Sequence, residues 1–74
     1  MGRNRDLKAA RAFAGLTQYD VSRAIGISEK EYSYYENGKA SPQPSVALRI
    51  AKVLDTSESK LWPDMFLKGS EVQL

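Results

Sequence analysis

The chain has 74 residues, which predicts a single small domain, and it carries 11 Lys or Arg, 9 Asp or Glu, and neither His nor Cys. Without His or Cys we expect no metal site, no cofactor, no small-molecule ligand and no activated nucleophile, so the protein is not expected to be an enzyme. No stretch approaches the roughly 18 consecutive apolar residues of a membrane span, and the first eight residues lack the apolar run of a signal peptide, so we expect a cytoplasmic protein without membrane contact.

The first predicted element is an amphipathic helix over residues 3–14. Leu7, Ala10 and Ala14 recur at the spacing of one helix face, and basic residues stand between them. Gly15 follows this segment and can adopt the left-handed conformation that ends many helices. The first helix is therefore predicted to end there.

A second, short helix is predicted after a capping signal. Thr17 and Asp20 have the spacing of a capping box, with Asp in the place of the usual Glu. The predicted apolar face consists of Val21, Ala24 and Ile25. Ser22 lies four residues before Gly26, and a small side chain there allows the next helix to cross closely. Gly26 is predicted to end the second helix.

The third predicted helix begins only two residues later. Ser28 and Glu31 have the spacing of a second capping box. We assign Tyr32 and Tyr35 to the buried side of this helix. Two helices of about eight residues joined by a glycine turn are the layout of a helix-turn-helix.

The remainder of the chain predicts a loop and two further helices. Residues 38–44 contain turn residues, and Pro44 suits the first position of a helix. The apolar residues of this fourth helix are Val46, Ala47, Ile50, Ala51, Val53 and Leu54. Ser57 can cap a last short helix, which Pro63 interrupts.

Five short motifs stand in order along these predicted elements. They are Gly15–Gln18, Ile27–Ser28, Glu36–Lys39, Pro42 and Ala47–Ala51. Their order and spacing resemble the Cro/CI-type (XRE) helix-turn-helix family of phage and plasmid transcriptional regulators, over about residues 4–62. The resemblance implies an all-α, five-helix, lambda-repressor-like domain whose helices 2 and 3 form the helix-turn-helix at about residues 17–38. We accordingly expect one domain over residues 1–68 and a flexible tail over residues 69–74.

The same resemblance implies a function. It implies a sequence-specific DNA-binding transcriptional regulator, a repressor, that inserts its third helix, about Ser28–Asn37, in the major groove of double-stranded DNA. It also implies a structural ion pair between Arg11 and Glu36. The DNA-binding residues that we expect are Arg5, Gln18, Ser28, Glu29, Lys30, Ser33, Tyr34, Asn37 and Lys39.

The charge of the predicted helix-turn-helix departs from this family. Residues 17–38 carry a net charge of −2, whereas residues 1–16 carry +3 and residues 39–74 carry +1. The basic charge therefore flanks the third helix. An alternative is a protein-binding, antirepressor-like regulator whose acidic helix-turn-helix surface binds a repressor or another basic partner.

Individual side chains of the third helix also have more than one interpretation. Glu31 either accepts from a cytosine amino group or completes the capping box with Ser28, and Glu29 either reads DNA or complements the helix dipole. Lys30 contacts a guanine or a phosphate, or is a solvated lysine. Tyr34 packs on a thymine methyl, binds a phosphate or is a surface aromatic.

Assembly is the last expectation. One short helix reads only one major groove, so we expect a homodimer on an operator with two half-sites. The apolar residues left over once a five-helix core is filled lie at the C-terminal end. For the dimer interface we expect Trp62, Met65, Phe66 and Leu67, with intramolecular packing as the other interpretation of these residues.

Overall fold

The computed structural model describes residues 3–65, which form five α-helices and no β-strand. The helices are α1 (Arg5–Phe13), α2 (Gln18–Ile25), α3 (Glu29–Glu36), α4 (Pro44–Val53) and α5 (Glu58–Leu61). Residues 63–65 are again helical. Within residues 3–65, no helix is both long enough and apolar enough to cross a membrane. The expected all-α architecture is confirmed.

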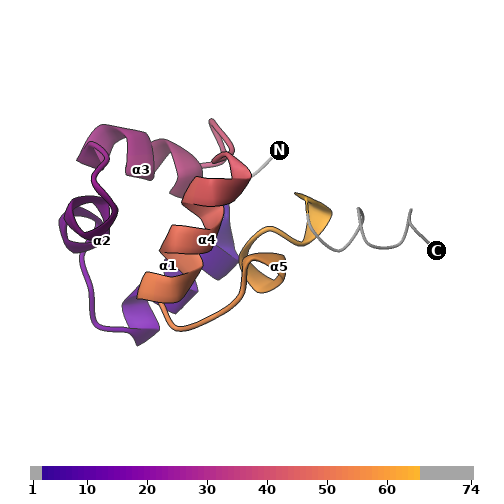
Figure 1. Ribbon diagram of the computed structural model, residues 1–74, viewed down its shortest axis with the longest axis horizontal. Helices are drawn as coiled ribbons and strands as arrows, with labels where there is room; N and C mark the ends of the chain where they lie inside the picture. Colours follow the sequence, from indigo (N-terminus) through magenta and orange to yellow (C-terminus); the bar gives the residue numbers. More distant parts are fainter. Residues whose placement is uncertain (1–2, 66–74) are drawn as a thin grey trace.

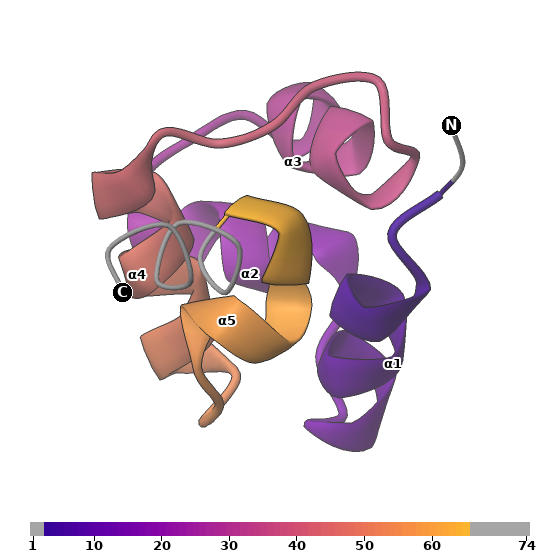
Figure 2. The same ribbon diagram turned by 90° about the vertical axis from the view of Figure 1, so that its right-hand side faces the viewer.

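The helices surround a small core, with α3 lying across one end of the molecule (Figure 1). In Figure 2, α3 is at the top, α1 and α4 stand on either side, and α5 lies in front of α2. The α2 helix packs against α3 and α4, while α5 packs against α1 and α4. Because α3 lies at the edge of this arrangement, one of its faces remains outside the core.

Every helix contributes to the core. The buried apolar residues are Leu7, Val21, Ile25, Tyr32, Tyr35, Ala47, Ile50, Ala51, Leu54, Leu61 and Trp62. The predicted burial of Tyr32 and Tyr35 is confirmed. Two predicted core positions are wrong, because Ala14 and Ala24 are exposed. Ala14 follows the last residue of α1, and the short α2 buries Ser22 instead of Ala24.

Trp62 also departs from the sequence-based expectation. Its side chain is 7% exposed and belongs to the core of the single chain. The expectation that it is left over after the core is filled is therefore wrong, because so small a domain needs the large apolar surface of an indole in its core. Met65 is exposed, and Phe66 and Leu67 lie outside the described residues.

Local signals account for the ends of the helices. Thr17 and Asp20 form the predicted reciprocal capping box of α2, with hydrogen bonds of 2.9 and 3.0 Å. The backbone N–H of Thr17 and then its hydroxyl stabilise the Asp20 carboxylate and hold its pKa below the ordinary value. Pro44 begins α4, as predicted.

Four helices share one kind of C-terminal end. In each, a backbone N–H just past the helix donates to the carbonyl oxygen five residues earlier. These bonds are Leu16 to Arg11, Ile27 to Ser22, Lys39 to Tyr34 and Thr56 to Ala51. Glycines occupy the left-handed position in the first three, and Asp55, with φ 58°, occupies it after α4.

Asn4 connects the start of the described chain to two distant helix ends. Its Oδ1 accepts from the backbone N–H of Leu7 at 3.0 Å and so caps α1. Its Nδ2 donates to the Leu61 carbonyl oxygen at 2.8 Å, and its backbone N–H donates to the Glu36 carbonyl oxygen at 2.8 Å. One residue thus fixes α1 relative to the ends of α3 and α5.

We expect Asn4→Ala to lower the free energy of unfolding by about 2 kcal/mol, because it removes an N-cap and a second hydrogen bond. Asn4→Ser keeps a capping oxygen but is too short to reach Leu61, so it should lose about half as much. Urea denaturation of the three proteins measures both effects. Equal stabilities of Asn4→Ala and the unsubstituted protein would contradict the structural role given to Asn4.

Candidate nucleic-acid interface

The α2 and α3 helices form a compact unit joined by a three-residue turn. Gly26, with φ 79°, ends α2 in the left-handed conformation, and the Ser28 hydroxyl accepts from the backbone N–H of Glu31 at 3.0 Å to begin α3. Ser22 is 2% exposed, and its hydroxyl donates to the Tyr19 carbonyl oxygen at 2.9 Å. The small, internally bonded Ser22 side chain allows the two helices to cross closely.

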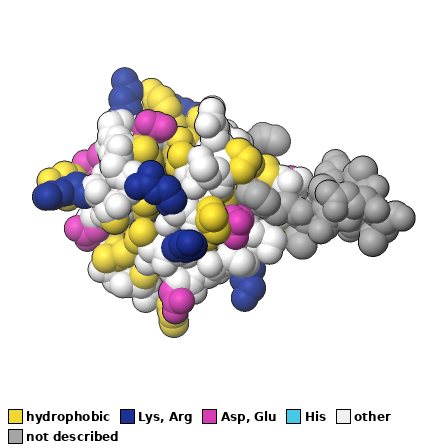
Figure 3. Space-filling view, viewed as in Figure 1, with side chains coloured by type: hydrophobic (Ala, Val, Ile, Leu, Met, Phe, Trp, Pro, Cys, Tyr) yellow, Lys and Arg dark blue, Asp and Glu magenta, His cyan; other side chains and the backbone are white. Residues whose placement is uncertain are grey.

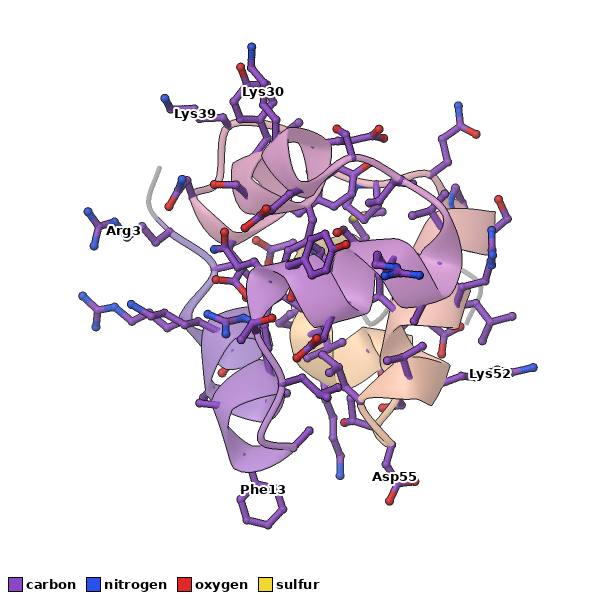
Figure 4. The ribbon with its side chains drawn as sticks, turned by 90° about the vertical axis from the view of Figure 1, so that its left-hand side faces the viewer. Arg3, Phe13, Lys30, Lys39, Lys52 and Asp55 are labelled. Atoms are coloured by element: carbon purple, nitrogen blue, oxygen red, sulfur yellow. The ribbon has the colours of Figure 1, made fainter. Side chains whose placement is uncertain are left out.

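The outer face of α3 is open to solvent. The predicted site residues Ser28, Glu29, Lys30, Tyr34, Asn37 and Lys39 are exposed, and Ser33 is partly exposed. The Asn37 amide nitrogen donates to the Ser33 hydroxyl at 3.2 Å. In Figure 4, Lys30 and Lys39 point outward at the α3 end of the molecule, whereas Phe13 and Asp55 lie at the opposite end. The residues predicted on α3 and its C-terminal turn are thus found on one accessible region.

Glu31 differs from its predicted role. Ser28 caps the Glu31 backbone N–H, but within residues 3–65 no hydrogen bond returns from the Ser28 backbone to the Glu31 carboxylate. This carboxylate instead accepts from the Tyr35 hydroxyl at 2.6 Å, one turn further along α3. Burial and this hydrogen bond raise the pKa of Tyr35 to about 12. The predicted capping box is therefore only half formed, because the Glu31 carboxylate is hydrogen-bonded to the Tyr35 hydroxyl and not to the Ser28 backbone.

A buried carboxylate links α1, α2 and α3. The Glu36 side chain is 3% exposed and accepts from Arg11 at both oxygens, with distances of 2.5 and 3.2 Å. The Gln18 amide nitrogen also donates to Glu36, at 3.0 Å, and Arg11 donates further to the Leu16 carbonyl oxygen at 2.9 Å. The ion pair implied by the family resemblance is present, and the neutral Gln18 amide adds a hydrogen bond to its carboxylate.

The electrostatics of this cluster favour the ionised pair. Burial raises the pKa of Glu36, but the hydrogen bonds from Arg11 and Gln18 outweigh it, so the pKa lies below its ordinary value. The hydrogen bond to Glu36 likewise raises the pKa of Arg11. Burial raises the pKa of the neighbouring Tyr32 hydroxyl, which has no hydrogen-bond partner within residues 3–65. Glu36 is therefore ionised at neutral pH.

A groove of about 410 Å³ lies between the N-terminal residues, the start of α2 and the end of α3. It is lined by Arg3, Asn4, Arg5, Lys8, Arg11, Gln18, Glu36 and Asn37. Three predicted site residues, Arg5, Gln18 and Asn37, therefore meet in one place. Arg3 and Lys8 were not singled out as site residues, although the net charge of +3 over residues 1–16 pointed to this region.

A second hollow, of about 610 Å³, lies on the other side of the N-terminal residues. Its lining includes Trp62 and Met65 together with the loop that follows α3. Two residues of the predicted dimer interface are described. Met65 is 37% exposed, whereas Trp62 is buried. Phe66 and Leu67, the other two interface residues, lie outside residues 3–65.

The acidic balance of the helix-turn-helix is smaller at its surface than in its sequence. Glu36 is buried in an ion pair, whereas Asp20, Glu29 and Glu31 remain exposed. On the face seen in Figure 3, Lys and Arg side chains are interspersed with acidic and apolar ones among the coloured residues. The basic groove is thus the main concentration of positive charge described above.

Comparison with known proteins relates this chain to a helix-turn-helix family and to a curated protein. The model of a helix-turn-helix family matches residues 7–61, a range that contains α2, the turn, α3 and α4. A protein of Bacillus subtilis (strain 168), the SPbeta prophage-derived uncharacterized HTH-type transcriptional regulator YonR, is 31% identical over 67 residues. The aligned region is 90% of this chain and 57% of YonR, so the chain spans just over half the length of that curated relative.

The Glu36 cluster predicts a pH dependence of stability. Because folding lowers the Glu36 pKa, its stabilisation is present at pH values above the ordinary 4.5 and is lost as the pH falls below it. Glu36→Gln should remove this dependence and lower the free energy of unfolding at neutral pH by about 3–5 kcal/mol, because Arg11 loses its buried partner. Chemical denaturation across this pH range measures both effects.

Glu29→Gln is the matched control, since Glu29 is exposed on the same helix and forms no ion pair within residues 3–65. It should leave both the stability and its pH profile close to those of the unsubstituted protein. If Glu36→Gln has the same stability at neutral pH as the unsubstituted protein, the pair contributes nothing to holding α3 in place.

Proposed function

Because this chain belongs to the helix-turn-helix family whose model matches residues 7–61, we propose that it is a sequence-specific DNA-binding transcriptional regulator. In this proposal the outer face of α3 enters the major groove, and the basic groove beside it binds the phosphate backbone. The observation that carries the proposal is the position of this groove. It places Arg3, Arg5 and Lys8 beside the end of α3.

The start of α2 gives further support for a phosphate contact. Gln18 is the first residue of α2, and a helix N-terminus attracts anions through its free backbone N–H groups. One N–H of the Gln18 amide is directed to Glu36, which leaves its second N–H for a phosphate oxygen. Glu36 therefore holds the Gln18 side chain at the edge of the groove.

The protein-binding alternative has less support. It rested on a net charge of −2 over residues 17–38. One of those four carboxylates, Glu36, is buried and paired with Arg11, while Asp20, Glu29 and Glu31 remain exposed. Without Glu36, the exposed charges of residues 17–38 sum to −1 rather than −2, so the acidic surface that would attract a basic partner is smaller by one charge.

We further propose that the protein acts in the cytoplasm as a repressor of phage or plasmid type and binds its operator as a homodimer. Repression requires only that the operator is occupied. In this proposal the α3 face and the basic groove bind the operator and so occupy it. A dimer places two α3 helices in successive major grooves about 34 Å apart. Met65 and the segment after it supply the subunit contact in this proposal.

Salt dependence tests the phosphate contacts. If the basic groove and the lysines of the α3 face neutralise about four phosphates per subunit, log K should fall with log salt concentration with a slope of about −4. Lys8→Ala should reduce the magnitude of this slope by about 0.9. Lys52→Ala is the matched control, because Lys52 is an exposed helical lysine that points away from α3 (Figure 4). A slope near zero for the unsubstituted protein would overturn the proposed DNA binding.

Selection of tight-binding sites from random-sequence duplex DNA tests the dimer. The selected sites should be inverted repeats with half-site centres about one helical turn, roughly 34 Å, apart. Met65→Glu places a charge in the proposed contact and should weaken binding to the full repeat more than binding to one isolated half-site. Selected sites without two-fold symmetry would show that a monomer binds.

A further inference from the structure

Tyr34 lies between two lysines on the exposed side of α3. The Lys30 ammonium nitrogen is 5.9 Å from the centroid of the Tyr34 ring, and the Lys39 ammonium nitrogen is 5.8 Å from it. Both distances are within the range of a cation–π interaction. Figure 4 shows both lysines at the same end of the molecule, directed away from its body.

The two lysines are free of carboxylates. Within residues 3–65, neither forms an ion pair, although Glu29 and Glu31 flank Lys30 in the sequence. The Glu31 carboxylate accepts a hydrogen bond from the Tyr35 hydroxyl on the same helix. Two ammonium groups near one ring repel each other, and the negative face of the ring offsets part of that repulsion. The cluster therefore retains two positive charges that can bind an anion.

The backbone holds this cluster together. Gly38, with φ 76°, turns the chain at the end of α3, and the backbone N–H of Lys39 donates to the Tyr34 carbonyl oxygen at 2.9 Å. The backbone N–H of Ala40 approaches the same oxygen at 3.3 Å. Lys39 is thus brought back beside Tyr34 by the helix end itself, while Lys30 precedes Tyr34 by one helical turn.

We infer that Lys30, Tyr34 and Lys39 act as one unit that binds the phosphate backbone of duplex DNA, with Tyr34 as the residue that positions both ammonium groups. This inference rests on the DNA binding proposed above. A lysine binds phosphate as a point charge, so two ammonium groups near one ring suit the densely charged backbone. A guanine contact would instead require Lys30 to extend alone toward a base edge. Lys30 is accordingly a phosphate contact in this arrangement.

The first experiment needs no DNA. In the NMR spectrum of the free protein, the ring current of Tyr34 should displace the ε-CH₂ signals of Lys30 and Lys39 from those of exposed Lys52. Tyr34→Phe should preserve the displacement, and Tyr34→Leu should abolish it. Tyr19→Leu is the matched control, because Tyr19 is the other exposed tyrosine with a cation over its ring, Arg23 at 5.6 Å. It should leave both lysine signals unchanged.

The second experiment measures binding to mixed-sequence duplex DNA. Tyr34→Phe should bind within about twofold of the unsubstituted protein, whereas Tyr34→Leu should bind about three- to tenfold more weakly at low salt. Lys30→Ala and Lys39→Ala should each reduce the magnitude of the salt slope by about 0.9. Lys30→Ala should weaken binding to all sequences equally. If circular dichroism shows that Tyr34→Leu is unfolded, the two lysine variants still test whether Lys30 and Lys39 bind phosphates.

The outcomes separate this inference from the proposed function. An unsubstituted protein that binds no duplex DNA would overturn both. If Tyr34→Leu binds DNA as well as the unsubstituted protein, or if Lys30→Ala changes the preferred base at one position, the inference alone is overturned. Displaced lysine signals together with the graded loss of affinity would establish the unit.

Discussion

The arrangement of the first three helices depends on the burial of one carboxylate. An ionised carboxylate at 3% exposure is unfavourable unless charges and hydrogen bonds compensate it. At Glu36 the compensation comes from Arg11 on α1 and Gln18 on α2, while the backbone carbonyl of the same residue accepts from Asn4. Because the partners come from three segments, satisfying Glu36 also sets the angle at which α3 leaves the core. The orientation of the α3 surface that is proposed to bind DNA thus depends on these buried contacts of Glu36.

Features that depend on neighbours in sequence could be predicted, and those that depend on distant partners could not. The Thr17–Asp20 capping box and the glycine ends follow from residues three to five positions apart, so the boundaries of α1, α2 and α3 were close to those found. Asn4 shows both cases. Its local role as the N-cap of α1 was missed because the helix was predicted to begin at residue 3. Its second partner, Leu61, is 57 positions away and could not be predicted. For the same reason the sequence could not show whether Trp62 faces its own core or a second subunit.

The candidate site shows the same division. The family resemblance correctly paired Arg11 with Glu36, but neither motif nor spacing indicated that Gln18 joins them or that Glu31 turns to Tyr35. Counting charges along the chain gave an acidic helix-turn-helix, whereas the folded chain buries part of that acidity and gathers the cations of residues 3–8 next to α3. Whether a charge acts on a partner is decided by burial and pairing, which a sequence count does not contain.

The helices themselves are short, from four residues in α5 to ten in α4. An isolated helix needs about 12–15 residues to persist in water, so none of these segments holds its shape without the others. The helices of residues 3–65 are therefore expected to fold and unfold together. A single proteolytic cut in a connecting loop would leave two fragments without structure.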